Sequence, residues 1–269
     1  MALFELVPNI SEGRNHETID RAVEAIGTTG ARVLHRTSDP VHNRSVLTIV
    51  GDASAVLEAA VALAGAVLET IDLRRHSGVH PRIGALDVVP FVPLRDATMA
   101  QAVELAHAAG QRIWHDYRIP CIYYGEAARS AEHTLLADVR SGPLIPDVGE
   151  GRGHETAGIV AIGARALLVA FNVELATADV RIARDIARTL RERDGGMRTL
   201  RALGFRLDEH RVQVSLNVTD HAATPLHRIV EIIRTLAAAR GVAVVGSELI
   251  GCIPQAAVET AARYYLGIP

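Results

Sequence analysis

The hydrophobic pattern of this chain has the same order of elements in its first and last parts, and this order constrains the fold more than any other feature of the sequence. In the first part, apolar runs and helical spacing predict strands and helices alternately at residues 3–8 (strand), 15–26 (helix), 31–34 and 45–50 (strands), 53–71 (helix) and 86–92 (strand). In the last part they do so at residues 166–172 (strand), 178–193 (helix), 199–207 and 212–218 (strands), 225–239 (helix) and 242–245 (strand). Both parts have the order βαββαβ.

This order is typical of the ferredoxin-like fold. The sequence predicts an α+β protein with two ferredoxin-like subdomains, at residues 1–165 and 166–269, packed with a ligand cleft between them. The duplication is one of pattern only, because no residue-by-residue repeat is visible. A single three-layer α/β domain is the alternative that the pattern leaves open.

The middle of the chain adds further elements to this pattern. Helices are predicted at residues 99–115 and 132–139, with a strand at residues 121–124 between them. Pro90 and Pro93 are taken to mark an edge or an end of the strand at residues 86–92, because proline cannot donate a backbone hydrogen bond.

Composition excludes several classes of function. All 28 basic residues are arginines, so a lysine Schiff base and a phosphate-loop lysine are both excluded. The net charge of -3 provides no basic surface for a polyanion, and no nucleic-acid partner is expected. Cys121 and Cys252 lie in apolar segments and are predicted to be buried thiols. With no signal-peptide core and no apolar run of membrane-spanning length, the protein is expected to be cytoplasmic, without a membrane partner.

The segment from Arg74 to Asp87 has the highest density of polar side chains. His76 and His80 lie four residues apart, but Gly78 and Pro81 argue against the helix that would aim both rings at one metal. No other Cys/His group has ligand spacing, so no metal is expected. A histidine that titrates near neutral pH beside arginines suits acid–base chemistry on a substrate with carboxylates. A solvated loop with incidental histidines is the alternative.

Polar residues at predicted strand ends are further candidates for ligand contacts. They are His42, Asn43 and Arg44 before one strand, and Asn172 and Asn217 at the ends of two others. Each is also a common turn or cap residue. Nucleotide binding and serine hydrolysis are not favoured, because the chain lacks G-x-G-x-x-G after a first strand and lacks G-x-S-x-G.

Eight segments spread over the whole chain together resemble the formiminotransferase family. They are VPNISEGRN (7–15), HNRSVLTIVG (42–51), HSGVHPRIGALDVVPFVP (76–93), YGEAAR (124–129), GPLIPDVG (142–149), GARALLVAFNVEL (163–175), VSLNVTDHAATPLHR (214–228) and VGSELIGCIP (245–254).

The resemblance implies transfer of the formimidoyl group from N-formimidoyl-L-glutamate to N5 of tetrahydrofolate, a step of histidine degradation and one-carbon metabolism. It also implies a homodimer or a larger assembly. His80, the second histidine of the H-x-G-x-H-P-R motif, matches the catalytic histidine of the family. The folate-binding stretch of the family falls on Gly149, Glu150, Gly151, Arg152, Gly153, His154, Glu155, Thr156, Ala157 and Gly158.

The chemistry of this transfer agrees with the polar residues. One residue must take and return a proton near pH 7, which histidine does without a metal. The donor and the folate carry carboxylates, for which arginine forks are suited. The predicted substrate-binding residues are therefore His42, Asn43, Arg44, Arg82, Arg165, Asn172 and Asn217. The alternatives are a glycine formimidoyltransferase, a 5-formyltetrahydrofolate cyclo-ligase and a folate-binding protein without catalysis.

Overall fold

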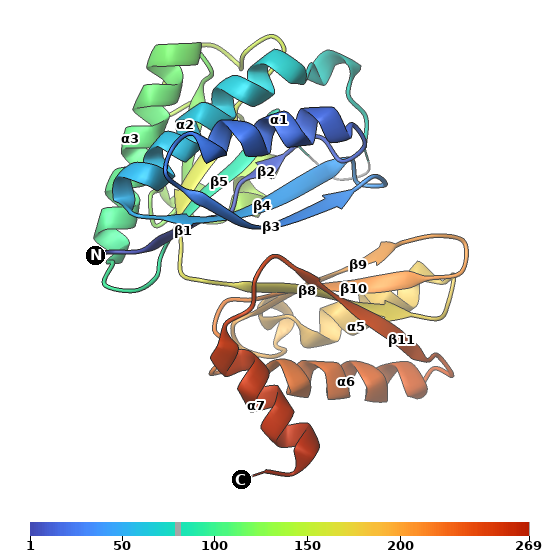
Figure 1. Ribbon diagram of the computed structural model, residues 1–269. Helices are drawn as coiled ribbons and strands as arrows, with labels where there is room; N and C mark the ends of the chain where they lie inside the picture. The colour runs from blue at the N-terminus through green and yellow to red at the C-terminus, as the bar shows by residue number, and fades with distance from the viewer. Residues whose placement is uncertain (79–81, 269) are drawn as a thin grey trace. The chain divides into compact units, whose positions relative to one another are not determined.

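The computed structural model describes residues 1–78 and 82–268. The chain divides into two compact units, Met1–Ala166 and Leu167–Pro269. Each unit has its own β-sheet, and in each unit long helices cover one face of that sheet (Figure 1). The architecture is therefore mixed α/β with two separate sheets.

The first unit contains one sheet of mixed strand direction. Its elements are β1 (Phe4–Leu6), β2 (Asn9–Ile10), α1 (His16–Gly27), β3 (Arg32–Asp39), β4 (Arg44–Gly51), α2 (Ala53–Thr70), the short 3-10 helix η1 (Leu73–Arg75), β5 (Leu86–Pro93), α3 (Met99–Tyr117), β6 (Cys121–Gly125), η2 (Ala131–His133), α4 (Leu136–Ser141) and β7 (Val160–Ala164). β1 and β2 both lie between β4 and β5, like two parts of one interrupted strand. β7 pairs in parallel with both β5 and β6.

The sequence explains where the helices of this unit begin. The Asn15 side chain accepts hydrogen bonds from the first backbone N–H groups of α1, and Asp52 does the same for α2. Thr98 and Gln101 form a reciprocal capping box at the start of α3. Each cap satisfies backbone donors that a helix start leaves unpaired.

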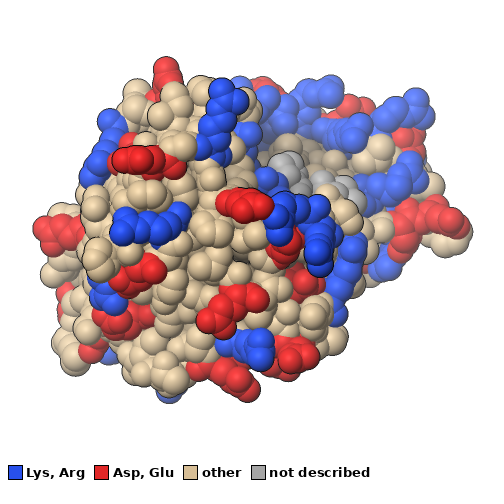
Figure 2. All heavy atoms as spheres, turned by 90° about the horizontal axis from the view of Figure 1, so that it is seen from above, with Lys and Arg blue, Asp and Glu red and all other residues tan. Residues whose placement is uncertain are grey.

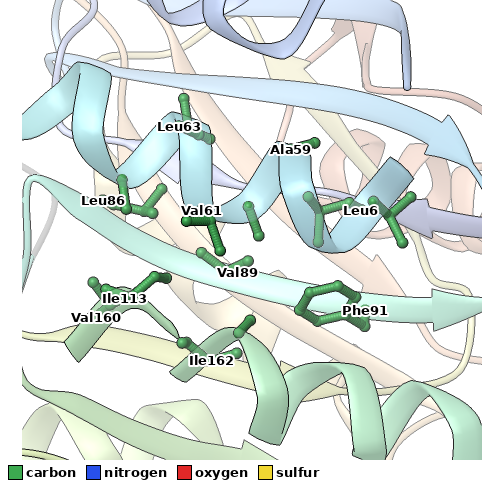
Figure 3. Close-up of a cluster of buried hydrophobic side chains, with 14 of the residues drawn as sticks. Leu6, Ala59, Val61, Leu63, Leu86, Val89, Phe91, Ile113, Val160 and Ile162 are labelled. Carbon is green, nitrogen blue, oxygen red and sulfur yellow. The ribbon is translucent and has the colours of Figure 1, made fainter. Parts of the chain in front are cut away.

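The main core of the first unit lies between the sheet and the helices α1, α2 and α3. Side chains of β1, α2, β5, α3 and β7 meet there, including Leu6, Leu63, Phe91, Ile113 and Ile162 (Figure 3). α2 is long and apolar enough by composition to cross a membrane, so the prediction that no apolar run reaches that length was wrong. In this fold its apolar face packs into the core, as expected of a core helix of a folded unit.

The second unit is a four-stranded antiparallel sheet with helices. Its elements are β8 (Val169–Leu175), α5 (Val180–Leu190), η3 (Glu192–Asp194), β9 (Leu200–Arg206), β10 (Val212–Val218), α6 (Leu226–Ala238), β11 (Val244–Ile250) and α7 (Gln255–Leu266). The strand order is β11-β8-β10-β9. The predicted hairpin is confirmed: the Asp208 carboxylate accepts hydrogen bonds from the N–H groups of His210 and Arg211 in the turn between β9 and β10.

The structure corrects three expectations. β5 lies inside the sheet, although Pro90 indicated an edge. Pro90 is tolerated in an inner strand because it faces the interruption between β1 and β2. At this interruption, Val7 donates its N–H to the Pro90 carbonyl oxygen. Asn172 lies in the middle of β8 and not at its end. Cys121 is buried as predicted, but Cys252 is exposed.

Candidate functional site

Three loops of the first unit meet at one end of its sheet. They are residues 11–15 after β2, residues 40–43 between β3 and β4, and the part of residues 71–85 that the structure describes before β5. Gly13 lets the first two approach closely, because a Cβ there would lie 2.3 Å from the Asp39 carbonyl oxygen and 2.6 Å from the Arg44 nitrogen. No other residue type fits this contact without moving the backbone.

Asn43 connects these loops. It is buried, with a φ of 49°, a left-handed conformation in which asparagine is more frequent than most residues. Its Oδ1 accepts the Gly13 N–H at 2.9 Å, and its Nδ2 donates to the Ser77 carbonyl oxygen at 3.0 Å. Nδ2 also lies 2.8 Å from Nε2 of His76. The predicted candidate Asn43 therefore joins all three loops.

The His76 ring lies between two donor groups. Nε2 faces the Asn43 amide, and Nδ1 contacts the Arg82 guanidinium. Arg82 also donates to the carbonyl oxygens of His42 at 3.0 Å and of Asn43 at 3.4 Å. Burial and then the charge of Arg82 lower the pKa of His76. The structure brings His42, Asn43, Arg82 and His76 together, whereas the predicted catalytic residue His80 lies outside the described residues.

Asp39 supplies a carboxylate beside this cluster. It accepts the backbone N–H groups of Val41 at 2.8 Å and of His42 at 2.9 Å, and it contacts the His42 ring. Burial raises the pKa of Asp39, but the hydrogen bonds from His42 and Val41 outweigh it and lower the pKa to about 2. Asp39 is therefore ionised at neutral pH.

Positive charge gathers on the neighbouring part of the sheet. Arg44 is half-buried and donates to Oδ1 of Asn9. Burial lowers the pKa of Arg44 to about 10, Asp87 raises it, and the charges of Arg140 and Arg82 lower it further. Arg44 is still charged at neutral pH. Asp87, which is buried, accepts the Ile83 N–H at 2.8 Å and pairs with Arg140.

Three arginines thus lie near Asp87, an arrangement suited to the carboxylates of a ligand. They are Arg44, Arg82 and Arg140. This group of arginines is a local feature. Over much of the face shown in Figure 2, arginine and acidic side chains alternate instead of separating by charge. Among residues 1–78 and 82–268, no group of three or more His, Cys, Asp or Glu side chains could hold a metal ion.

The predicted folate-binding stretch, residues 149–158, runs along the segment before β5. The carbonyl oxygens of Thr156 and Ala157 accept the N–H groups of Leu73 and Ala85, both at 2.8 Å. Gly158 has a φ of 69°, and a Cβ there would lie 2.3 Å from the Ile83 carbonyl oxygen, so glycine is required. Glu155 pairs with Arg74, and the His154 ring accepts the N–H groups of Thr156 and Ala157 at 3.3 Å.

Other predicted substrate residues lie elsewhere in the fold. Arg165 follows β7, where its N–H donates to the Phe91 carbonyl oxygen at 3.1 Å, at the opposite end of β5 from the three loops. Asn172 and Asn217 belong to the second unit. The Asn172 amide donates to the Glu248 carboxylate at 3.0 Å, and Asn217 is exposed on β10.

Sequence reasoning missed Asn9, Asp39 and Arg140. Asn9 follows a proline at a strand interruption, and Arg140 lies on a helix of six residues without a motif. The Asp-Pro sequence at residues 39–40 was the one available signal, since such pairs favour turns.

Comparisons with known proteins cover both units. The family model "Formiminotransferase domain, N-terminal subdomain" matches residues 3–165, and the family model "Formiminotransferase domain" matches residues 170–268. Glutamate formimidoyltransferase from Streptococcus pyogenes serotype M1 is 41% identical over 280 residues, covering 99% of this chain and 94% of that protein. The protein of the same name from Thermoplasma acidophilum is 40% identical, with coverage of 99% and 93%. Formimidoyltransferase-cyclodeaminase from Sus scrofa is 39% identical and is matched over 52% of its length.

Proposed function

The chain belongs to the formiminotransferase family, and on this premise we propose how its residues transfer a formimidoyl group from N-formimidoyl-L-glutamate to N5 of tetrahydrofolate. Two curated relatives at about 40% identity, matched over nearly their full length, are glutamate formimidoyltransferases. This chain is an enzyme of that activity, and tetrahydrofolate is its co-substrate.

We propose that each unit is one ferredoxin-like subdomain, at residues 1–165 and 166–269. In the second unit, β8, α5, β9, β10, α6 and β11 follow the order βαββαβ, with the sheet order β11-β8-β10-β9. The first unit has the same order when β1 and β2 are counted as one strand, with β6 and β7 added beyond β5.

We propose His80 as the general acid–base residue. The N5 amine of tetrahydrofolate attacks the formimidoyl carbon, and a tetrahedral centre forms as that amine loses its proton. When the centre collapses, the bond to the glutamate nitrogen breaks, and this nitrogen takes up a proton as it leaves. A single imidazole that accepts the first proton and returns it serves both steps. This assignment rests on the H-x-G-x-H-P-R motif.

One observation carries the location of the site. Backbone hydrogen bonds hold the proposed folate stretch, residues 149–158, against the segment that leads into and out of the His80 motif, through Leu73 and Ala85. Folate bound there would contact the segment whose sequence contains the proposed acid–base residue, and a reaction between two bound substrates requires such proximity.

We propose that Arg44 and Arg82, with His42 and Asn43, bind the substrate carboxylates and polar groups. Their charges and positions at the three loops support this role. The proposed contacts of Arg165, Asn172 and Asn217 rest on the matching motifs alone. We further propose a cytoplasmic homodimer that acts without a bound metal. Sedimentation should then give twice the chain mass of 28.8 kDa, and chelator treatment should leave turnover unchanged.

The test of the acid–base assignment is His80→Ala. We expect turnover to fall by about two to four orders of magnitude, while calorimetry shows nearly unchanged affinity for tetrahydrofolate. His76→Ala is the matched variant and is expected to lose less. Near-full activity of His80→Ala would contradict the assignment.

The donor is tested with two substrates. N-formimidoyl-L-glutamate has a side-chain carboxylate that N-formimidoylglycine lacks, and an arginine left without its partner is costly. We expect the glutamate donor to be preferred by about a hundredfold or more in kcat/KM. Equal rates would favour a glycine formimidoyltransferase. Folate binding without product from either donor would favour the cyclo-ligase or the folate-binding protein.

A further inference from the structure

Asn43 contacts the chain on both sides of residues 79–81. Its amide donates to the carbonyl oxygen of Ser77, and its backbone carbonyl accepts from Arg82, which also donates to the carbonyl of His42. Residues 42–43 therefore contact the described residues Ser77 and Arg82, which flank His80 in the sequence.

The position demands asparagine for two separate reasons. The φ of 49° disfavours most side chains, and the amide is used at both ends, by the Gly13 N–H at 2.9 Å and by the Ser77 carbonyl at 3.0 Å. Glycine would keep the backbone conformation but would lose both side-chain hydrogen bonds. Aspartate would keep the acceptor for Gly13 but would lose the donor.

The same amide determines what the His76 ring faces. A charged imidazole carries a proton on each nitrogen, and these protons would point at the donor groups of Asn43 and Arg82. The charged groups that act on this ring are Arg82 and Arg14, which disfavour its charge, and Glu12, which favours it. The contacts with Asn43 and Arg82 hold the ring in place, and burial and then the charge of Arg82 lower its pKa.

We propose that Asn43 is a positioning residue for the formimidoyl transfer, whose amide anchors His76 and the backbone on both sides of the segment that carries His80. This inference rests on the proposed role of His80. It gives Asn43 a positioning role in place of the substrate contact proposed above, because its buried amide is used at both ends within the protein. The effect on the reaction passes through its neighbours and needs no contact with the reacting atoms.

Asn43→Asp provides a readout that a purely structural role would not move. The new carboxylate oxygen faces Nε2 of His76, where it favours a protonated ring. We therefore expect the pKa of His76, followed by NMR titration and assigned with His76→Gln, to rise by about one unit or more. The carboxylate also faces the Ser77 carbonyl without a donor. We expect kcat to fall about tenfold or more, while KM for each substrate changes less than about threefold.

Asn43→Gly is the second variant, and it decides the matter if Asn43→Asp does not fold. Glycine retains the left-handed backbone but leaves the buried Gly13 N–H without its acceptor, which is destabilising. The protein should therefore remain folded with a lower unfolding midpoint, while kcat falls to a similar extent. Asp52→Asn makes the reverse change at the cap of α2, outside the three loops, where asparagine is equally suitable, and should leave kcat and the His76 titration unchanged.

Two results would overturn the proposal. One is wild-type kcat in folded Asn43→Asp or Asn43→Gly, and the other is an unchanged His76 titration in Asn43→Asp. A wild-type protein without transfer activity would overturn the proposed function instead, and the His76 titration would still decide whether Asn43 anchors the ring.

Discussion

Arg140→Met is expected to destabilise the first unit through the carboxylate that it leaves behind. The Asp87 side chain is 2% exposed and pairs with Arg140, which is 17% exposed. The Ile83 N–H also donates to this carboxylate at 2.8 Å but carries no charge that would balance it. Breaking a buried ion pair on one side costs about 3 to 5 kcal/mol, because an uncompensated charge stays buried.

The chemistry of the carboxyl group sets an upper limit on this cost. The mutant can protonate the carboxylate instead, which at pH 7 costs about 4 kcal/mol, or about 1.4 for each of the roughly three pH units down to the range where carboxyls protonate. Arg44 and Arg82 both interact with Asp87 and offset a part of the cost. We therefore expect a loss of about 3 kcal/mol at pH 7 and of no more than about 2 kcal/mol at pH 5.5.

Urea unfolding at both pH values measures this loss. Trp114 is the single tryptophan of the chain and lies in α3 of the first unit, so its fluorescence reports on the correct part of the protein. The control is the double variant Arg140→Met/Asp87→Asn, which removes the charge and should be more stable than Arg140→Met alone. A loss below about 1 kcal/mol at pH 7, or an equal loss at both pH values, would refute this reasoning.

Three further predictions concern residues in or beside the three loops of the candidate site. Gly78→Ala would place a Cβ 2.5 Å from the His42 carbonyl oxygen, so we expect kcat in a steady-state assay to fall about tenfold to a hundredfold; unchanged kcat would show that the loop adapts. Asn15→Ala removes the cap of α1 and should cost about 1 kcal/mol in urea unfolding. The pKa of Asp39 is lowered from 3.8 to about 2, so its contribution to stability is present above about pH 4 and is lost as the pH falls towards 2. Because this side chain is 43% exposed, acid unfolding of Asp39→Asn should differ by only about 1 kcal/mol.

The elements that could be predicted are those with their own local signals. α1 and α2 have caps at Asn15 and Asp52 followed by apolar spacing, and β9 and β10 flank a turn that Asp208 stabilises. β7 was missed because its sequence, VAIGA, has small residues in a glycine-rich stretch, and its strand conformation depends on parallel pairing with β5 and β6. α7 was missed because its alanine-rich sequence buries little.

The candidate site shows the same distinction. His76 and Arg82 were found because polar side chains are dense in one short segment. That Asn43 takes a left-handed conformation and bonds to two distant loops depends on partners 30 and 34 residues away, which spacing alone does not reveal. Arg140 lies at the site because it pairs with Asp87, 53 residues earlier in the chain.

The interrupted strand formed by β1 and β2 has a consequence for how the protein is made. Phe4 pairs with Gly51 on one side and with Pro93 on the other, so β1 has no partner until β4 has been synthesised and lacks its second partner until β5 has been synthesised. At about 5 to 20 residues per second, this wait lasts roughly 5 to 20 seconds. During that time the apolar side chains of Phe4 and Leu6, which are completely buried in the finished protein, are exposed on the nascent chain and available to chaperones that bind extended apolar segments.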